Sequence, residues 1–125
     1  MFDHVEFAVS NVSASREFYV HALAALNISE HFYTEDESAA GFGIDDVTAL
    51  LIFKGDAGQR KLHICFKAQS AQHVIAAYQA ALANGGKDNG APGYRENYSP
   101  GYYAAFTLDP DGNNIEFLFR EAASI

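Results

Sequence analysis

The feature that most constrains this sequence is an internal repeat at a constant offset of 59 residues. Without a gap, FDHVEFAVSNVSASREFYVHALAAL, which starts at residue 2, aligns with KLHICFKAQSAQHVIAAYQAALANG, which starts at residue 61. An ungapped series of identities indicates two copies of one structural unit, so we expect two tandem modules. The offset (63 − 4 = 59) pairs His4 with His63, Phe7 with Phe66 and Tyr19 with Tyr78.

Each copy begins with a short alternating strand and continues as a helix. Residues 70–86 carry apolar residues at helical spacing between a serine and two glycines, which predicts a helix with Ser70 as its N-cap. The first helix uses matching positions, with Ser10 or Asn11 before it. The segments after each helix predict strands at 30–34, 39–44 and 47–53 in the first copy, and at 87–89, 101–108 and 114–120 in the second.

Each module is therefore expected to be β-α-β-β-β, which places the chain in the α+β class. We expect residues 1–55 and 61–121 to form the two modules of one domain. A single unit of this kind leaves an open curved sheet with exposed edges, so two units must pack together.

Charge and cysteine content narrow the function classes. The formal charge is −8 and no basic cluster occurs, which argues against nucleic acid and anionic membrane as partners. Cys65 is the single cysteine and fits a reducing compartment, while the N-terminus carries no basic segment typical of a secretory signal. A cytoplasmic location is the expectation. We expect the Cys65 side chain to be a small buried hydrophobe rather than a nucleophile.

Three polar residues on expected strands are candidates for one site. In the first strand of each copy we expect the apolar side chains to pack against the helix. This packing leaves His4 and His63 on the opposite, concave face of the sheet. Glu116 sits second in the apolar run IEFLF, where an unpaired charge would cost several kcal/mol. If a pseudo-twofold axis relates the modules, two imidazoles and one carboxylate can converge in one cup, and such a set binds divalent metals with open positions.

The repeated β-α-β-β-β units, the histidine in each first strand and the ending DPDGNNIEFLF resemble the vicinal oxygen chelate superfamily. That superfamily includes glyoxalase I, extradiol dioxygenases, fosfomycin-resistance thiol transferases and bleomycin-resistance proteins. The resemblance implies a glyoxalase-like fold, in which the modules form a curved mixed sheet or cup. It also implies a divalent metal, Fe(II), Mn(II), Ni(II) or Zn(II), held by His4, His63 and Glu116, with Glu116 as the catalytic residue.

One departure from the superfamily concerns its fourth ligand. Glyoxalase I has a further carboxylate in the last strand of the first module, and aligning TALLIFKG with NIEFLFRE (116 − 50 = 66) places Leu50 opposite Glu116. Leucine cannot bind a metal, so strict lactoylglutathione lyase activity is doubtful. The pattern is closer to the members with three ligands.

Other residues are candidates for substrate binding or support. Glu6 shares the His4 face and could be a supporting residue or a residue of the exposed rim. The expected loop at residues 90–103 combines an arginine with tyrosines between glycine and proline, a composition that suits a substrate-binding loop, a surface loop or a dimer contact. Its candidates are Arg95, Tyr94, Tyr98, Tyr102 and Tyr103, and alternation allows only one of the last two to face the cup.

Two function classes remain open. The first is a small metal-dependent enzyme whose metal chelates neighbouring oxygens of a small molecule, with lyase or isomerase, dioxygenase or thiol-transferase chemistry. The alternative is a metal-free protein that binds a small molecule, as bleomycin-resistance proteins do, and a third, less favoured, is a regulatory module with a vestigial ligand set. Small relatives commonly form homodimers, so a dimer is expected, with each cup within one chain or shared between two.

Overall fold

The computed structural model describes residues 1–122 and contains two four-stranded mixed sheets, each with one helix. The N-terminal sheet has the strand order β1-β4-β3-β2, with β1 (Val5–Val9) parallel to β4 (Val47–Lys54). β3 (Ala39–Ile44) and β2 (Ser29–Tyr33) complete it in antiparallel order, and α1 (Val12–Ala24) covers one face.

The C-terminal sheet repeats this topology with the order β5-β8-β7-β6. β5 (His63–Lys67) is parallel to β8 (Asn114–Arg120), and β7 (Tyr102–Leu108) and β6 (Lys87–Tyr94) are antiparallel to their neighbours. α2 (Ala71–Ala83) packs on one face of this sheet. The expected class, α+β with two β-α-β-β-β modules, is confirmed.

The internal repeat is exact for the helices. Both have 13 residues and their bounds differ by 59 (71 − 12 = 59). The side chain of Asn11 caps α1 by accepting from the Ala14 amide, and Ser70, 59 residues later, caps α2 by accepting from the His73 amide. The sequence alternatives Ser10 and Asn11 are thus resolved in favour of Asn11.

The expected strands are confirmed to within a residue or two, except β6. This strand runs to Tyr94, so part of the expected loop at residues 90–103 is sheet. β6 is an edge strand, where Pro92 needs no hydrogen-bonded amide, and its register shifts on both sides of Gly90. The true loop begins after Tyr94 and ends before Tyr102.

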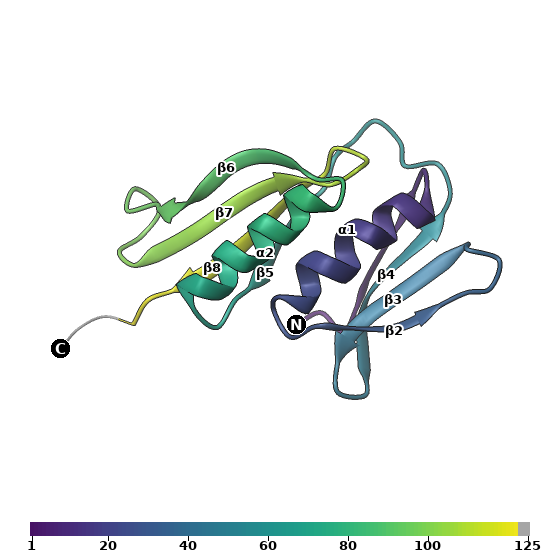
Figure 1. Ribbon diagram of the computed structural model, residues 1–125, viewed down its shortest axis with the longest axis horizontal. Helices are drawn as coiled ribbons and strands as arrows, with labels where there is room; N and C mark the ends of the chain where they lie inside the picture. Colours follow the sequence, from purple (N-terminus) through teal and green to yellow (C-terminus); the bar gives the residue numbers. More distant parts are fainter. Residues whose placement is uncertain (123–125) are drawn as a thin grey trace.

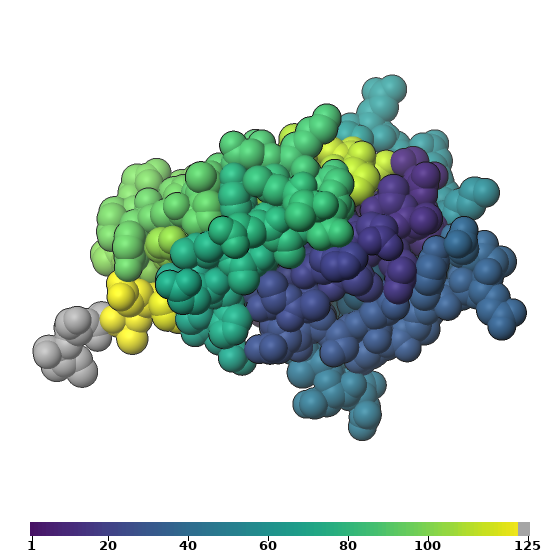
Figure 2. Space-filling model, viewed as in Figure 1, coloured from purple at the N-terminus to yellow at the C-terminus, as the bar shows by residue number. Residues whose placement is uncertain are grey.

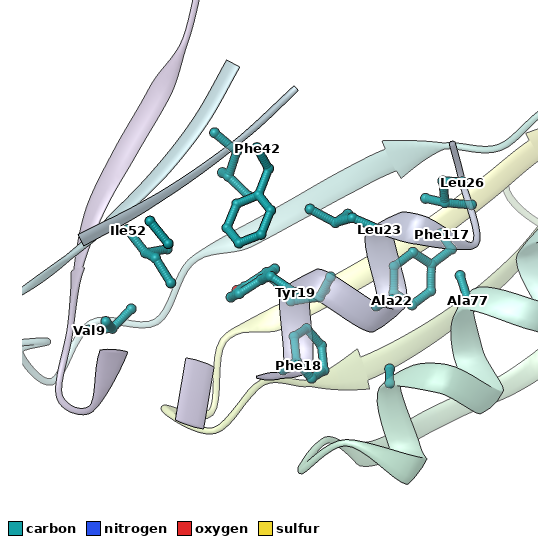
Figure 3. Packing of buried hydrophobic residues seen from close by; sticks show 14 of the residues in the cluster. Val9, Phe18, Tyr19, Ala22, Leu23, Leu26, Phe42, Ile52, Ala77 and Phe117 are labelled. Atoms are coloured by element: carbon teal, nitrogen blue, oxygen red, sulfur yellow. The ribbon is translucent and has the colours of Figure 1, made fainter. Parts of the chain in front are cut away.

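The two helices lie side by side at the centre of the molecule, between the two sheets (Figure 1). Their contact is visible along one face of the space-filling view (Figure 2). Ala77 and Ala81 are fully buried on α2, and such small side chains let the helices approach closely. Figure 3 shows α1 serving both modules, with labelled neighbours Phe42 and Ile52 of the N-terminal sheet and Phe117 and Ala77 of the second module.

The turn between β7 and β8 ties the second module to the first. Its Asp109 carboxylate is 3% exposed and accepts from the backbone amides of Asp111 and Asn113. The same carboxylate accepts from the hydroxyl of Tyr19 on α1 at 2.5 Å, and Asp111 accepts from the amide and hydroxyl of Ser10. The DPDG sequence thus forms both a turn and a contact between modules.

We call the face of each sheet that is turned away from the helices its open face. The alternation of buried and accessible residues in β1 and β5 puts the apolar side chains on the helix side, as expected. Within residues 1–122, no helix is long and apolar enough to span a membrane.

Candidate metal centre

The open face of the C-terminal sheet brings His63 and Glu116 together. His63 Nε2 lies 2.9 Å from Glu116 Oε1, within hydrogen-bond distance. The two residues come from neighbouring parallel strands, in which Cys65 pairs with Glu116 and His63 pairs with Asn114. The Glu116 side chain is 4% exposed and that of His63 is 55% exposed, so the carboxylate lies at the floor and the imidazole reaches solvent.

A second donor reaches the same carboxylate from β7. The Tyr102 hydroxyl donates to Glu116 Oε2, so both carboxylate oxygens have a partner. Within residues 1–122, Glu116 has no lysine or arginine within salt-bridge distance. The buried carboxylate is therefore held by a tyrosine and a histidine and keeps no fixed cationic partner.

The protonation of two neighbours follows from this environment. Partial burial, then the hydrogen bond to Glu116 and its negative charge, raise the pKa of Tyr102 well above its ordinary value, so the phenol keeps its proton at neutral pH. Partial burial of the thiol and the charge of Glu116 raise the pKa of Cys65 to about 12. Cys65 is thus a weak nucleophile. It is also exposed on the open face, so the prediction of a buried hydrophobe was wrong.

His4 lies just before β1, in the other module. Its Nδ1 is 2.8 Å from Asp3 Oδ1, and its Nε2 is 4.0 Å from Glu6 Oε2. The hydrogen bond to Asp3 raises the pKa of His4. When a carboxylate accepts a hydrogen bond from one ring nitrogen of a histidine, it fixes the orientation of the ring and leaves the other nitrogen free to bind a metal. Asp3, which the sequence did not single out, thus contacts Nδ1 of His4, and Glu6 lies on the Nε2 side.

The donor chemistry of His63 and Glu116 fits a divalent metal. Two ligands at about 2.1 Å from a metal and at right angles to each other lie about 3.0 Å apart, close to the observed 2.9 Å. Imidazole with carboxylate suits Fe(II), Mn(II), Ni(II) and Zn(II). Within the described chain, however, no group of three His, Cys, Asp or Glu side chains could hold a metal ion, so His4 does not join the pair inside one chain.

The equivalent of Glu116 in the first module is Leu51, so the assignment to Leu50 was wrong. Glu116 pairs with Cys65 across the parallel ladder, and the repeat equates Cys65 with Glu6 (65 − 6 = 59). Glu6 pairs with Leu51, whereas Leu50 is 5% exposed in the core. Leucine occupies either position, so the first module supplies no fourth carboxylate there.

The aromatic candidates divide between the two faces of the C-terminal sheet. Tyr102 lies on the open face, and the Tyr98 ring packs edge-on against it at 5.2 Å between centroids. Tyr103 packs toward the core, and Tyr94 packs edge-on against Tyr103 at 5.0 Å. Only Tyr98 and Tyr102 are thus near the Glu116 pair.

Arg95 is engaged with the backbone of β6. Its guanidinium donates to the carbonyls of Ala91 and Gly93 at 2.8 and 2.9 Å and lies 5.5 Å from the centre of the Phe106 ring. Phe106, which sequence reasoning missed, is in turn 6.3 Å from the His63 ring. Its alternation with Ala105 was the signal that could have placed it on the open face.

Comparison with known proteins gives a family and a fold. A family model described as the Glyoxalase/Bleomycin resistance protein/Dioxygenase superfamily matches residues 1–117. A glyoxalase/bleomycin resistance protein from Albidiferax ferrireducens T118 is similar in structure, with a TM-score of 0.80 and 32% identity, over 96% of this chain and 99% of that one. No curated protein matches the chain in sequence.

More distant solved structures share the fold. A glyoxalase-related enzyme from Fulvimarina pelagi has a TM-score of 0.72 and 15% identity, over 95% of this chain and 87% of that one. Lactoylglutathione lyase from Agrobacterium tumefaciens has a TM-score of 0.67 and 17% identity, over 95% and 92%. At such identities the likeness concerns architecture and not chemistry.

Proposed function

The chain belongs to the Glyoxalase/Bleomycin resistance protein/Dioxygenase superfamily, and we propose that it is a small metal-dependent enzyme acting on a small molecule with two neighbouring oxygens. The observation that carries the proposal is Glu116, whose side chain is 4% exposed, hydrogen-bonded to His63 and without a fixed cation among the described residues. A bound divalent cation would offset the cost of burying this charge. It would also supply Lewis-acid activation of the two substrate oxygens.

We further propose that the third ligand, His4, comes from a second copy of the chain. His4 and the His63–Glu116 pair do not meet within one chain. Between the two sheets, on their helix-facing sides and near the junction of β1 and β5, lies an apolar hollow of about 170 Å³ whose lining includes Val5, Leu50, Ile64 and Phe66 and no polar side chain. A homodimer that covers this hollow would remove apolar surface from water and would allow His4 of a second chain to complete the ligand set.

Within the site, the residues of this chain have separable roles. Tyr102 keeps its proton and so acts as a fixed donor that orients the carboxylate through Oε2. The other carboxylate oxygen, Glu116 Oε1, contacts His63. This oxygen is the atom that can accept a proton from the substrate and return it. Phe106 and Tyr98 supply apolar walls near His63 and Tyr102.

A metal-free binding protein is the second candidate. Its support is that His63 and Tyr102 already satisfy both oxygens of Glu116, and that the formal charge of −8 suits a cationic ligand. The reaction class within the enzyme proposal stays open among lyase or isomerase, dioxygenase and thiol-transferase chemistry.

Metal content separates the two candidates. The protein would be purified without nickel affinity, reconstituted with Fe(II) under anaerobic conditions, Mn(II), Ni(II) or Zn(II), desalted and measured by mass spectrometry. We expect about one metal per chain in the wild type and at least a tenfold loss of affinity in Glu116→Gln, His63→Gln and His4→Gln, since each removes one of few ligands.

Matched controls are Glu121→Gln and His21→Gln, which change exposed residues of the same types. They should retain the metal. No metal in the wild type after reconstitution with all four ions would contradict the enzyme proposal and favour the binding protein. Equal metal content in the wild type and the Glu116→Gln variant would contradict the assigned ligand set.

A further inference from the structure

Two cations lie at the ends of neighbouring strands without an acidic partner. Lys67 ends β5 and Arg120 ends β8, and neither makes an ion pair within residues 1–122. Arg120 has one long hydrogen bond, 3.5 Å to the Ser99 hydroxyl, and its guanidinium lies 5.1 Å from the centre of the Tyr102 ring. In this acidic chain, with 16 acidic and 8 basic residues, Lys67 and Arg120 bring two positive charges together on neighbouring strands.

These cations share the open face with the candidate metal centre. His63 pairs with Asn114, two residues before Glu116, and Lys67 pairs with Leu118, two residues before Arg120. The pair Lys67–Arg120 therefore repeats the arrangement of His63–Glu116 four residues farther along both strands (67 − 63 = 4; 120 − 116 = 4). Four residues of strand span about 13 Å, and the Tyr102 side chain lies between, with its ring near Arg120 and its hydroxyl at Glu116.

A pocket of about 480 Å³ opens beside the two cations. Its apolar wall comes from both modules. An apolar wall with a few convergent charged groups is the usual composition of a site for a small amphipathic molecule. The lining includes Lys67, Arg120, Leu26, Ile28, Ile44 and Phe119.

We propose that Lys67 and Arg120 bind the anionic end of the substrate, a carboxylate or a phosphate, while its neighbouring oxygens lie at His63 and Glu116. This assignment rests on the proposed function, because it places the anion at the far end of the same open face. Arg120 offers the planar fork that suits carboxylate and phosphate, and Lys67 adds a second charge. The apolar wall of the pocket, which includes Phe119 on the helix side of the sheet, would bind apolar groups attached near the anion.

The test measures anion binding to the metal-free protein. Octanoate, its neutral counterpart octanamide and inorganic phosphate would be titrated while the backbone amide signals of Ala68 and Phe119 are followed by NMR. We expect the wild type to bind octanoate or phosphate at least about tenfold more tightly than octanamide, because charge-assisted hydrogen bonds are the stronger ones. Tighter octanoate would identify an amphipathic carboxylate, and tighter phosphate a phosphate ester.

The Lys67→Gln/Arg120→Gln double variant should lose this preference, and the charge-matched Lys54→Gln/Lys87→Gln variant, which changes two exposed lysines elsewhere, should keep it. The proposal is overturned if octanoate and phosphate bind no better than octanamide, or if both double variants behave alike. Metal content of the Lys67→Gln/Arg120→Gln variant distinguishes the two proposals. Anion binding without metal binding would support the anion subsite and contradict the metal centre. Metal binding without anion binding would contradict only the anion subsite.

Discussion

A carboxylate can occupy the second position of an apolar strand when its neighbours supply donors. Removing Glu116 from water costs several kcal/mol, and a hydrogen bond to a charged group contributes about 1.5–3 kcal/mol, so the two donors His63 and Tyr102 offset much of that cost. Tyr102 donates a hydrogen bond but keeps its proton, so it does not neutralise the negative charge of Glu116. This remaining charge is the physical reason to expect a cation at Glu116.

Tyr102→Phe tests the contribution of the phenol. Loss of the donor to a nearly buried carboxylate should lower the free energy of unfolding at neutral pH by about 1–3 kcal/mol, as measured by urea denaturation. Tyr98→Phe is the control, because its side chain is 59% exposed and its hydroxyl makes no hydrogen bond within residues 1–122. Equal effects of the two substitutions would show that the Tyr102 contact does not stabilise the fold.

For single residues, the sequence predicted which face of a strand the polar side chains occupy. It predicted less well which residues on neighbouring strands they pair with. Alternation allowed one of Tyr102 and Tyr103 on the open face, but only the register against β8 selects Tyr102. The position equivalent to Glu116 was misplaced by one residue for the same reason: Leu50 and Leu51 are chemically alike, and a one-residue slip exchanges the two faces.

The elements themselves were largely predictable because each strand–helix unit carries its own apolar period and cap. The exceptions are irregular strands. β6 contains glycine and proline and pairs with bulges, and the β2–β3 and β3–β4 ladders also shift register. At Gly43 a Cβ would lie 1.8 Å from the Val47 carbonyl oxygen, so glycine is required where β3 and β4 shift. Such features depend on the partner strand, which a local pattern does not contain.

Tyr19→Phe tests the contact between α1 and the β7–β8 turn. Asp109 would lose one donor while its backbone partners remain, so we expect the free energy of unfolding at neutral pH to fall by about 1.5–3 kcal/mol. Tyr33→Phe is the control, since the Tyr33 hydroxyl makes no hydrogen bond among the described residues. Similar losses in both variants would contradict a specific role for this contact.

The same pair predicts an alkaline pH dependence. Burial, and then the charge of Asp109, raise the pKa of Tyr19 well above its ordinary value of 10. Below pH 10 both folded and unfolded chains keep this proton. Above it only the unfolded chain releases it, so wild-type stability falls by up to about 1.4 kcal/mol per pH unit from this residue. The difference between wild type and Tyr19→Phe should therefore narrow above pH 10, and a constant difference up to pH 11 would contradict the assignment.

At the scale of the molecule, the helices join the modules and leave two open faces that carry different parts of the candidate site. His4, with Asp3 and Glu6, belongs to the first module, and His63 with Glu116 to the second. The sequence identified all three candidate ligands from the repeat and a family resemblance. Whether one chain or two would bring them together depends on how the modules pack, for which the strands and helices carry no local signal.

The measurement that tests the central claim most directly is metal binding by mixed dimers. Chains carrying His4→Ala and Glu116→Ala, each expected to lose the metal alone, would be co-expressed and assayed for metal content. If each site takes His4 from one chain and the other ligands from its partner, every mixed dimer contains one intact site, and about one quarter of all sites recover with random pairing. Co-expression of His63→Ala with Glu116→Ala should recover none, because both changes fall in the same half of the site. Recovery in the first pair alone is the predicted result. Absence of recovery in a mixed dimer whose formation is verified would contradict a site shared between two chains.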